Sequence, residues 1–204
     1  MKRLRESALN TGKEYDCIFK QRSIDGANSY DIDRWNKLLS RFRGGRFVDL
    51  GCLDSLAPIL AKKKYPTSDI WGLDCARESM EFLAKTCPEI NYLYGDVYEN
   101  MFPDNYFDYA IAGELMEHLE FPERFVGETF RSLKIGGILA ISVPKGETEA
   151  GEVDGERHIW SFEKVDVKNL LNPYGKVHIT EMRSILFPFY EYRFPTIVAF
   201  CQKR

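Results

Sequence analysis

Hydrophobic residues along this chain gather in short continuous runs, and the segments between the runs carry apolar residues at helical spacing. Each run is four to seven residues long, a length typical of buried strands rather than helices. We predict strands at 46–50, 69–74, 90–93, 107–112 and 138–144. Helices are predicted at about 55–64, 77–85 and 122–133, the last ended by Gly136 and Gly137. Such strand-helix-strand units form right-handed parallel crossovers, which place the strand tips at one edge of a sheet.

The regions on either side of this core give weaker patterns. Residues 15–30 mix aromatic residues with Ser, Asn, Gly and Asp, which predicts an irregular segment. A helix is expected from about residue 31, and core packing is expected for its apolar stripe of Trp35, Leu38, Leu39 and Phe42. After the fifth strand we expect a helix that ends at 171 and two further strands at 177–182 and 196–201.

Composition and charge narrow the class of protein. With 204 residues, 44% of them hydrophobic, the chain can form one well-packed domain. Its 28 basic and 31 acidic residues give no broad attraction to nucleic acid or to anionic membranes. The five cysteines show no paired spacing and are interpreted as reduced thiols. Because no leader and no run of about 18 apolar residues occur, we expect a cytoplasmic protein without a membrane span.

The first strand leads into the turn around which the chain is organised, Phe-Val-Asp-Leu-Gly-Cys-Leu-Asp-Ser at 47–55. Gly51 allows the backbone to turn, and Asp54 or Ser55 can cap the next helix. A dinucleotide fingerprint needs three glycines, and this stretch has one. At the strand tip, Asp49 would repel a pyrophosphate but attract a ligand that carries an ammonium and a sulfonium. S-adenosylmethionine is such a ligand.

Two further acids follow the next two strands. Asp74 lies 25 residues after Asp49, at the end of the second strand, where a carboxylate can accept both hydroxyls of a ribose. A helix cap for 77–85 is the alternative role of Asp74, and it does not exclude the first. Asp96 follows the third strand in a Gly-Asp turn, so three acids are expected at one rim of the sheet.

The stretch at 47–55 resembles the first motif of class I S-adenosylmethionine-dependent methyltransferases, in which an acid precedes a glycine-rich turn. Leu53 and Ser55 stand where that family usually carries further glycines. The glycine pair in 131–137 resembles a late motif of the family. The resemblance implies that S-adenosylmethionine is the cofactor, with adenine recognised by Asp96 and the backbone of Val97. The implied cofactor-binding residues are Asp49, Gly51, Cys52, Asp74, Cys75, Asp96, Val97, Ala112, Gly113 and Glu114.

A second resemblance covers 107–119, which reads Phe-Asp-Tyr-Ala-Ile-Ala-Gly-Glu-Leu-Met-Glu-His-Leu. It is similar to the methyltransferases of ubiquinone biosynthesis and related small-molecule enzymes. If 114–119 is helical, Glu114 and His118 share a face, and His118 or Glu117 can take a proton from the substrate. The alternative is a purely structural role. A metal site of Glu114, Glu117 and His118 is a third interpretation, but one short turn seldom completes a coordination shell, so no metal is predicted.

The second half of the chain adds one candidate and two unassigned segments. His158 lies in a stretch that faces the substrate in similar enzymes, so His118, Glu117 and His158 are the predicted catalytic residues. Residues 145–157 are acidic and glycine-rich, and predict a loop where a substrate lid would lie. The aromatic cluster at 187–194 can line an acceptor pocket, dock a partner or close the core.

The resemblance implies a single α/β domain with a doubly wound, mostly parallel seven-stranded sheet, a Rossmann-like methyltransferase fold whose last strand is reversed. We assign 46–204 to this domain and 1–45 to an N-terminal extension, in which Tyr15, Phe19 or Tyr30 can form part of a lid. The predicted function is methyl transfer from S-adenosylmethionine to a small-molecule acceptor rather than to nucleic acid, with the oligomeric state open. The alternatives are a non-catalytic binding or scaffolding protein of the same fold and, less favoured, a nicotinamide-dependent oxidoreductase.

Overall fold

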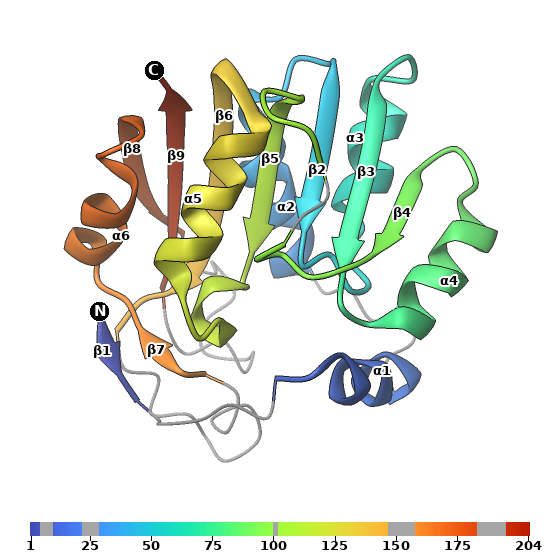
Figure 1. The fold of residues 1–204 in the computed structure, drawn as a ribbon, viewed down its shortest axis with the longest axis horizontal. Coiled ribbons are helices and arrows are strands. Elements are labelled where there is room, and N and C mark those ends of the chain that lie inside the picture. The colour runs from blue at the N-terminus through green and yellow to red at the C-terminus, as the bar shows by residue number, and fades with distance from the viewer. Residues whose placement is uncertain (5–9, 22–28, 100–101, 147–157, 183–194) are drawn as a thin grey trace.

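The computed structural model describes residues 1–4, 10–21, 29–99, 102–146, 158–182 and 195–204 (Figure 1). The aromatic cluster predicted at 187–194 and most of the loop predicted at 145–157 lie outside these residues. The helices are α1 (Gly12–Gln21), α2 (Ser29–Leu38), α3 (Ala57–Lys64), α4 (Arg77–Thr86), α5 (Pro122–Ser132) and α6 (Lys164–Leu171). The strands are β1 (Lys2–Arg3), β2 (Arg46–Leu50), β3 (Asp69–Asp74), β4 (Asn91–Tyr94), β5 (Phe107–Gly113), β6 (Leu133–Pro144), β7 (Trp160–Ser161), β8 (Gly175–Met182) and β9 (Thr196–Lys203).

Seven strands form one sheet in the order β4-β3-β2-β5-β6-β9-β8. The pairs among β4, β3, β2, β5 and β6 are parallel, whereas β9 runs antiparallel to both β6 and β8. The predicted doubly wound, mostly parallel sheet with a reversed last strand is therefore confirmed. From β2 the chain builds the sheet in one direction through β3 and β4, and then returns to β5 on the other side of β2. The carboxyl ends of β2 and β5 thus form the switch point at which such sheets bind ligands.

Helices cover both faces of the sheet. Figure 1 shows α5 and α6 in front of the strands and α2 and α3 behind them, in agreement with the contacts of each helix. The predicted stripe of Trp35, Leu38, Leu39 and Phe42 is buried in the core behind the sheet. Phe42 packs there against the rings of Phe47 and Tyr109, at centroid distances of 5.2 and 5.5 Å. The N-terminal part of the chain therefore supplies one side of the core on which the first strand rests.

Two predicted elements differ from the structure. Residues 15–30 were expected to be irregular, but α1 occupies 12–21 and α2 begins at Ser29. The expectation for Gly136 and Gly137 was also wrong, because α5 ends at Ser132 and β6 begins at once with Leu133. The glycine pair lies inside β6, where the pairing with β5 shifts register and Gly136 has a φ of 79°. The glycines therefore mark a bulge rather than a helix end, because the register with β5 shifts here and Gly136 takes the left-handed backbone of a G1-type bulge.

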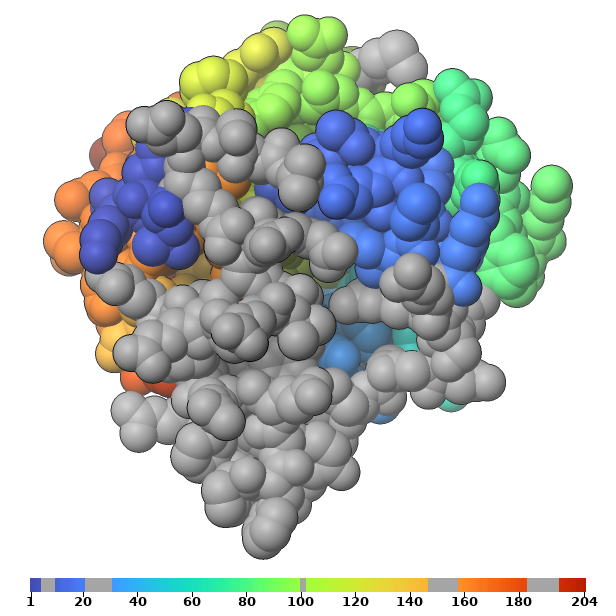
Figure 2. All heavy atoms as spheres, turned by 90° about the horizontal axis from the view of Figure 1, so that it is seen from below, coloured from blue at the N-terminus to red at the C-terminus, as the bar shows by residue number. Residues whose placement is uncertain are grey.

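Two short segments lie along the carboxyl edge of the sheet (Figure 1). β1 pairs with β7, so residues near the start of the chain hold the segment that leads into α6. The helix α1 packs against α4, and Figure 2 shows its blue atoms beside the green ones on this face of the molecule. The described part of the chain contains no helix with the length and apolar character that crossing a bilayer requires.

Candidate active site

The turn after β2 has the backbone that its glycine predicts. Gly51 has a φ of 73°, and a Cβ at this position would lie 2.6 Å from Cδ1 of Leu115. The N–H groups of Gly51 and Cys52 both donate to the carbonyl of Leu73, at 2.8 and 3.2 Å. The Cys52 thiol is buried, with Sγ 3.8 Å from Sδ of Met80. Gly51 is thus required by conformation and space, whereas the Cys52 side chain belongs to the core.

Leu53 takes a conformation that glycine adopts more readily. Its φ is 37°, in the left-handed region that is costly for a leucine. The Leu53 N–H donates to Oδ2 of Asp74 at 2.9 Å, and its carbonyl accepts a hydrogen bond from Ser79. The departure from the glycine-rich motif therefore leaves the turn itself intact.

Asp49 is a buried acid with spare hydrogen-bonding capacity. Its side chain is 2% exposed, and Oδ2 has no hydrogen-bond partner among the residues that the structure describes. Burial raises the pKa of Asp49 to about 7, and a hydrogen bond from Ser55 opposes this rise. A buried carboxylate without a full set of partners is costly, so a cationic ligand at the tip of β2 would be stabilised by it.

Asp74 lies beside Asp49, at the tip of β3. Its Oδ1 accepts the N–H of Ala76 at 2.8 Å, and its Oδ2 accepts the N–H of Leu53. The side chain is 6% exposed, and burial raises its pKa. Each carboxylate oxygen can accept a second hydrogen bond, so both remain able to receive a ribose hydroxyl. The start of α3 differs slightly from expectation, since Leu56 is the capping residue and Ser55 accepts the N–H of Ala57.

The other predicted cofactor residues line the same edge. Cys75 is half-buried beneath the start of α1. Gly12 lies so close to it that a Cβ on Gly12 would be 2.1 Å from the carbonyl oxygen of Cys75. Asp96 is exposed and accepts the N–H of Tyr98 at 2.8 Å, whereas Val97 is 7% exposed and packs into the core. An exposed carboxylate next to a buried apolar residue leaves the side chain of Asp96 and the backbone of Val97 available to a ligand.

The tip of β5 carries the next three predicted residues. Ala112 is buried, Gly113 faces Leu38, and Glu114 follows with a φ of 52°. The Glu114 N–H donates to both the carbonyl and the hydroxyl oxygen of Ser142, at 3.0 and 3.2 Å. Since only Met116–His118 forms a short 3₁₀ helix, the interpretation of 114–119 as one helical face is wrong. The left-handed Glu114 breaks the helix and directs its side chain differently.

Arg34 is a site residue that the sequence did not single out. It is 8% exposed on α2, with Nη2 at 2.9 Å from Asp31 Oδ1 and Nη1 at 3.5 Å from Glu114 Oε1. Burial raises the pKa of Glu114, and the charge of Arg34 opposes the rise. A basic residue within the apolar stripe of a helix, three positions after an acid, is a signal that could have indicated the pair of Arg34 with Asp31, but not the pair with Glu114.

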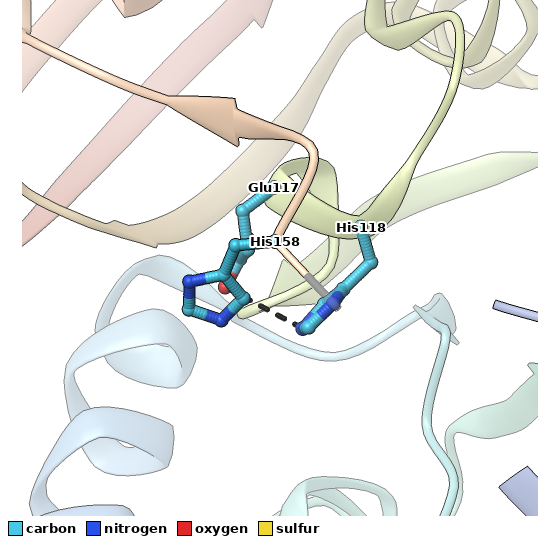
Figure 3. Close-up of side chains that lie close together, drawn as sticks. All are labelled: Glu117, His118 and His158. Atoms are coloured by element: carbon cyan, nitrogen blue, oxygen red, sulfur yellow. Dashed lines mark ion pairs between the residues drawn. The ribbon is translucent and has the colours of Figure 1, made fainter. Parts of the chain in front are cut away.

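The predicted catalytic residues lie together (Figure 3). His118 Nε2 is 4.0 Å from Glu117 Oε1, and the rings of His118 and His158 are 4.8 Å apart at their centroids. Glu117 is 1% exposed, and neither carboxylate oxygen has a hydrogen-bond partner in the described part of the chain. Burial raises the pKa of Glu117 well above its usual value, and Glu114 adds to the rise. A hydrogen bond from the Ile159 N–H to the Glu117 carbonyl, at 2.7 Å, brings His158 to this place.

The segment 10–21, which includes α1, contacts both the end of the 3₁₀ helix at His118 and the helix α4. Asn10 donates to the His118 carbonyl at 2.7 Å, and the Tyr15 ring lies 6.3 Å from the His118 ring. Further along, Phe19 packs on Phe82 of α4, with centroids 5.6 Å apart. Of the three residues predicted for a lid, Tyr15 therefore lies beside His118 at the edge of the sheet and Phe19 lies on α4, while the side chain of Tyr30 lies outside the described residues.

Comparisons with known proteins agree with this architecture. Residues 48–141 match the methyltransferase domain family. The trans-aconitate 2-methyltransferase of Azoarcus sp. (strain BH72) is 26% identical over 102 residues, which are 50% of this chain and 40% of that protein. The chain spans less than half the length of the curated relatives it matches.

Solved structures show the same fold at low sequence identity. The [4+2]-cyclase SpnF has a TM-score of 0.78 at 15% identity, covering 97% of this chain and 99% of that one. A chain from the complex of the Haloferax volcanii Trm112 methyltransferase activator with a methyltransferase has a TM-score of 0.76 at 17% identity, covering 93% and 97%. The family match includes the acid-glycine turn after β2 and the switch point at β5, and together with these relatives it supports a class I S-adenosylmethionine-dependent methyltransferase.

Proposed function

We propose that this protein transfers the methyl group of S-adenosylmethionine to a small-molecule acceptor. The observation that carries the proposal is Asp49, a buried carboxylate at the tip of β2 with an oxygen that lacks a hydrogen-bond partner among the described residues. It lies next to the tight turn at Gly51 and at the switch point of the sheet. A ligand with an ammonium group supplies the positive charge that this site lacks.

The remaining rim residues fit the other parts of the cofactor. Asp74 would accept the ribose hydroxyls while it keeps its bonds to Leu53 and Ala76. Asp96 and the backbone of Val97 would recognise the adenine, and Cys75 would lie beside it under α1. Residues 112–114 would lie between the cofactor and the acceptor, because they end the strand next to β2.

Methyl transfer from S-adenosylmethionine needs little acid-base catalysis by the protein. A lone pair on the acceptor attacks the methyl carbon in line with the carbon–sulfur bond, and the electrons of that bond pass to the sulfur. The protein aligns the two reactants and excludes water. Glu117, His118 or His158 would take the acceptor proton, since the three lie together just after residues 112–114 at the end of β5.

A small-molecule acceptor is favoured by charge. The chain has a net charge of −3, and the charged side chains of the candidate site are five acids and one arginine, so a phosphate backbone would be repelled. We propose that α1, within the extension 1–45, covers the bound cofactor, because it already contacts Cys75 and His118.

The test is calorimetric titration with S-adenosylmethionine, with NAD as the control ligand. We expect saturable binding of S-adenosylmethionine and none of NAD. Asp74→Asn should weaken binding about 10- to 100-fold, as expected for charge-assisted hydrogen bonds. Asp69→Asn is the matched control, because Asp69 lies on the same strand at the opposite edge of the sheet. An absence of binding at millimolar concentration would reject the enzyme and favour the non-catalytic alternative, with Leu53 marking a lost site.

A further inference from the structure

One group of side chains at the carboxyl edge has the composition of a metal site. Glu117, His118 and His158 each direct a ligand atom toward the others, and these atoms lie within 4.8 Å of one another (Figure 3). Two of them come from the 3₁₀ helix after β5, and the third comes from a segment 40 residues later. His158 is therefore the distant ligand that the short turn with Glu117 and His118 cannot provide by itself.

We propose that Glu117, His118 and His158 bind one divalent transition-metal ion. Two imidazole nitrogens and one carboxylate form the ligand set of catalytic zinc sites and of iron(II) sites that keep open positions. In this set the carboxylate contributes one negative charge, and the two neutral imidazoles supply nitrogen ligands of the type that transition metals prefer over calcium or magnesium.

The burial of Glu117 supports a cation at this place. The side chain is 1% exposed, and neither carboxylate oxygen has a hydrogen-bond partner in the described part of the chain. Nε2 of His118 lies 4.0 Å from Oε1 of Glu117, which is too far for a hydrogen bond. Buried polar groups are nearly always satisfied, so a carboxylate in this state indicates a missing partner. A metal ion between the three residues would be that partner.

The geometry needs only a small adjustment. Metal–nitrogen and metal–oxygen bonds of about 2.0–2.2 Å place two ligands of one ion no more than about 4.4 Å apart. The ligand atoms of the group lie within 4.8 Å of one another, so the three side chains would have to move closer by a few tenths of an ångström or more to hold one ion. The backbone is already fixed, since the Ile159 N–H donates to the Glu117 carbonyl and β7 pairs with β1 directly after it.

The remaining coordination positions would face the acceptor, a point that rests on the proposed function. An acceptor hydroxyl bound to the ion would have a lowered pKa. With Glu117, His118 and His158 engaged as ligands, the hydroxyl would release its proton to water instead of to one of these side chains. Its oxygen lone pair would then form the bond to the methyl carbon as the carbon–sulfur bond breaks. The site therefore favours an oxygen acceptor.

The test measures metal binding without cofactor or acceptor. Protein stripped by a chelator is titrated with Zn²⁺ in competition with a chromophoric indicator, in a Cys17→Ser background that removes an exposed thiol. Co²⁺ is added in parallel because its ligand-field absorption reports nitrogen and oxygen coordination. We expect one ion per chain, and at least a tenfold loss of affinity in Glu117→Gln and in His158→Gln. His178→Gln is the matched control, because His178 is exposed on β8 and should leave binding unchanged.

Two results would overturn the inference. The first is wild-type affinity for Zn²⁺ in Glu117→Gln and His158→Gln, and the second is an absence of stoichiometric binding by the unmutated chain. Circular dichroism melts and the titration with S-adenosylmethionine show whether each variant is folded. Because the metal titration contains no cofactor, its outcome is independent of the test for methyl transfer.

Discussion

Asp49 gives the most direct prediction, because its burial couples cofactor binding to a proton. Burial raises the pKa of this carboxyl to about 7, so near neutral pH it is partly protonated in the ligand-free protein. Only the ionised form attracts an ammonium group. We therefore expect S-adenosylmethionine to bind the ionised form and to expel the proton from Asp49, and we expect the affinity to fall as the pH is lowered.

The size of the effect follows from the pKa. With a value of about 7, roughly one half of the sites are ionised at pH 7 and roughly one tenth at pH 6. Because the observed Kd equals the intrinsic Kd divided by the competent fraction, binding weakens about fivefold between pH 7 and pH 6, and about tenfold for each further unit. This range stays below the pKa of an α-ammonium group, about 8, so the cofactor keeps its charge.

Calorimetry measures both quantities. Titrations at pH 7 in buffers of different ionisation enthalpy should show the release of about half a proton for each cofactor bound. Asp49→Asn should bind more weakly and should lose most of the pH dependence. The reasoning would be refuted by a wild-type Kd that is constant from pH 7 to pH 5.5, or by a variant that keeps the full slope.

Three further predictions follow from the same edge of the sheet. The ligand-free protein should lose stability as the pH rises from about 4 to 7, since Asp49 binds its proton more tightly when folded than when unfolded. Thermal melts at several pH values check this, and Asp49→Asn should show a smaller slope but not a flat one, because Asp74, Glu114 and Glu117 keep their raised pKa values. Gly51→Ala should lower the free energy of unfolding by about 1–3 kcal/mol, because the φ of 73° and the neighbouring atoms exclude a Cβ. Leu53→Gly should change it by no more than about 1 kcal/mol, because relief of the backbone strain offsets the added entropy of the unfolded chain. Urea unfolding measures both variants. Asp16→Ala removes the acceptor of the Glu78 N–H, 2.8 Å away, and should raise hydrogen exchange in α1 without changing that of the central strands.

Most strands of the sheet could be predicted from the sequence, because each buried strand is a short apolar run that ends in a polar residue. The bounds predicted for β2 and β3 match the structure, and the acids at their ends meet as the topology requires. The residues of α1 were missed because residues 15–30 mix aromatic residues with Ser, Asn, Gly and Asp, a composition that favours an irregular segment. Gly136 was misplaced because a glycine pair after a helix is equally compatible with a helix end and with a bulge.

The candidate site was predicted at the level of strand tips and not at the level of side-chain directions. Asp49 and Asp74 could be placed together because parallel strands end at one edge. The positive φ of Glu114 could not be predicted, since a non-glycine residue gives no local sign that it will be left-handed. The pairing of Arg34 with Glu114 depends on the packing of α2 against the sheet, which only the tertiary structure shows.

The pairing of β1 with β7 has a consequence for the order in which this protein folds. Residues 2–3 pair with 160–161, so the segment that carries His158 is fixed by a contact between residues that lie about three quarters of the chain apart. Closing such a long loop costs entropy that a local turn such as the one at Gly51 does not. We expect the acid-glycine turn at Gly51 to form early in folding and His158 to reach its place late. The candidate site is then complete only after β1 and β7 have paired.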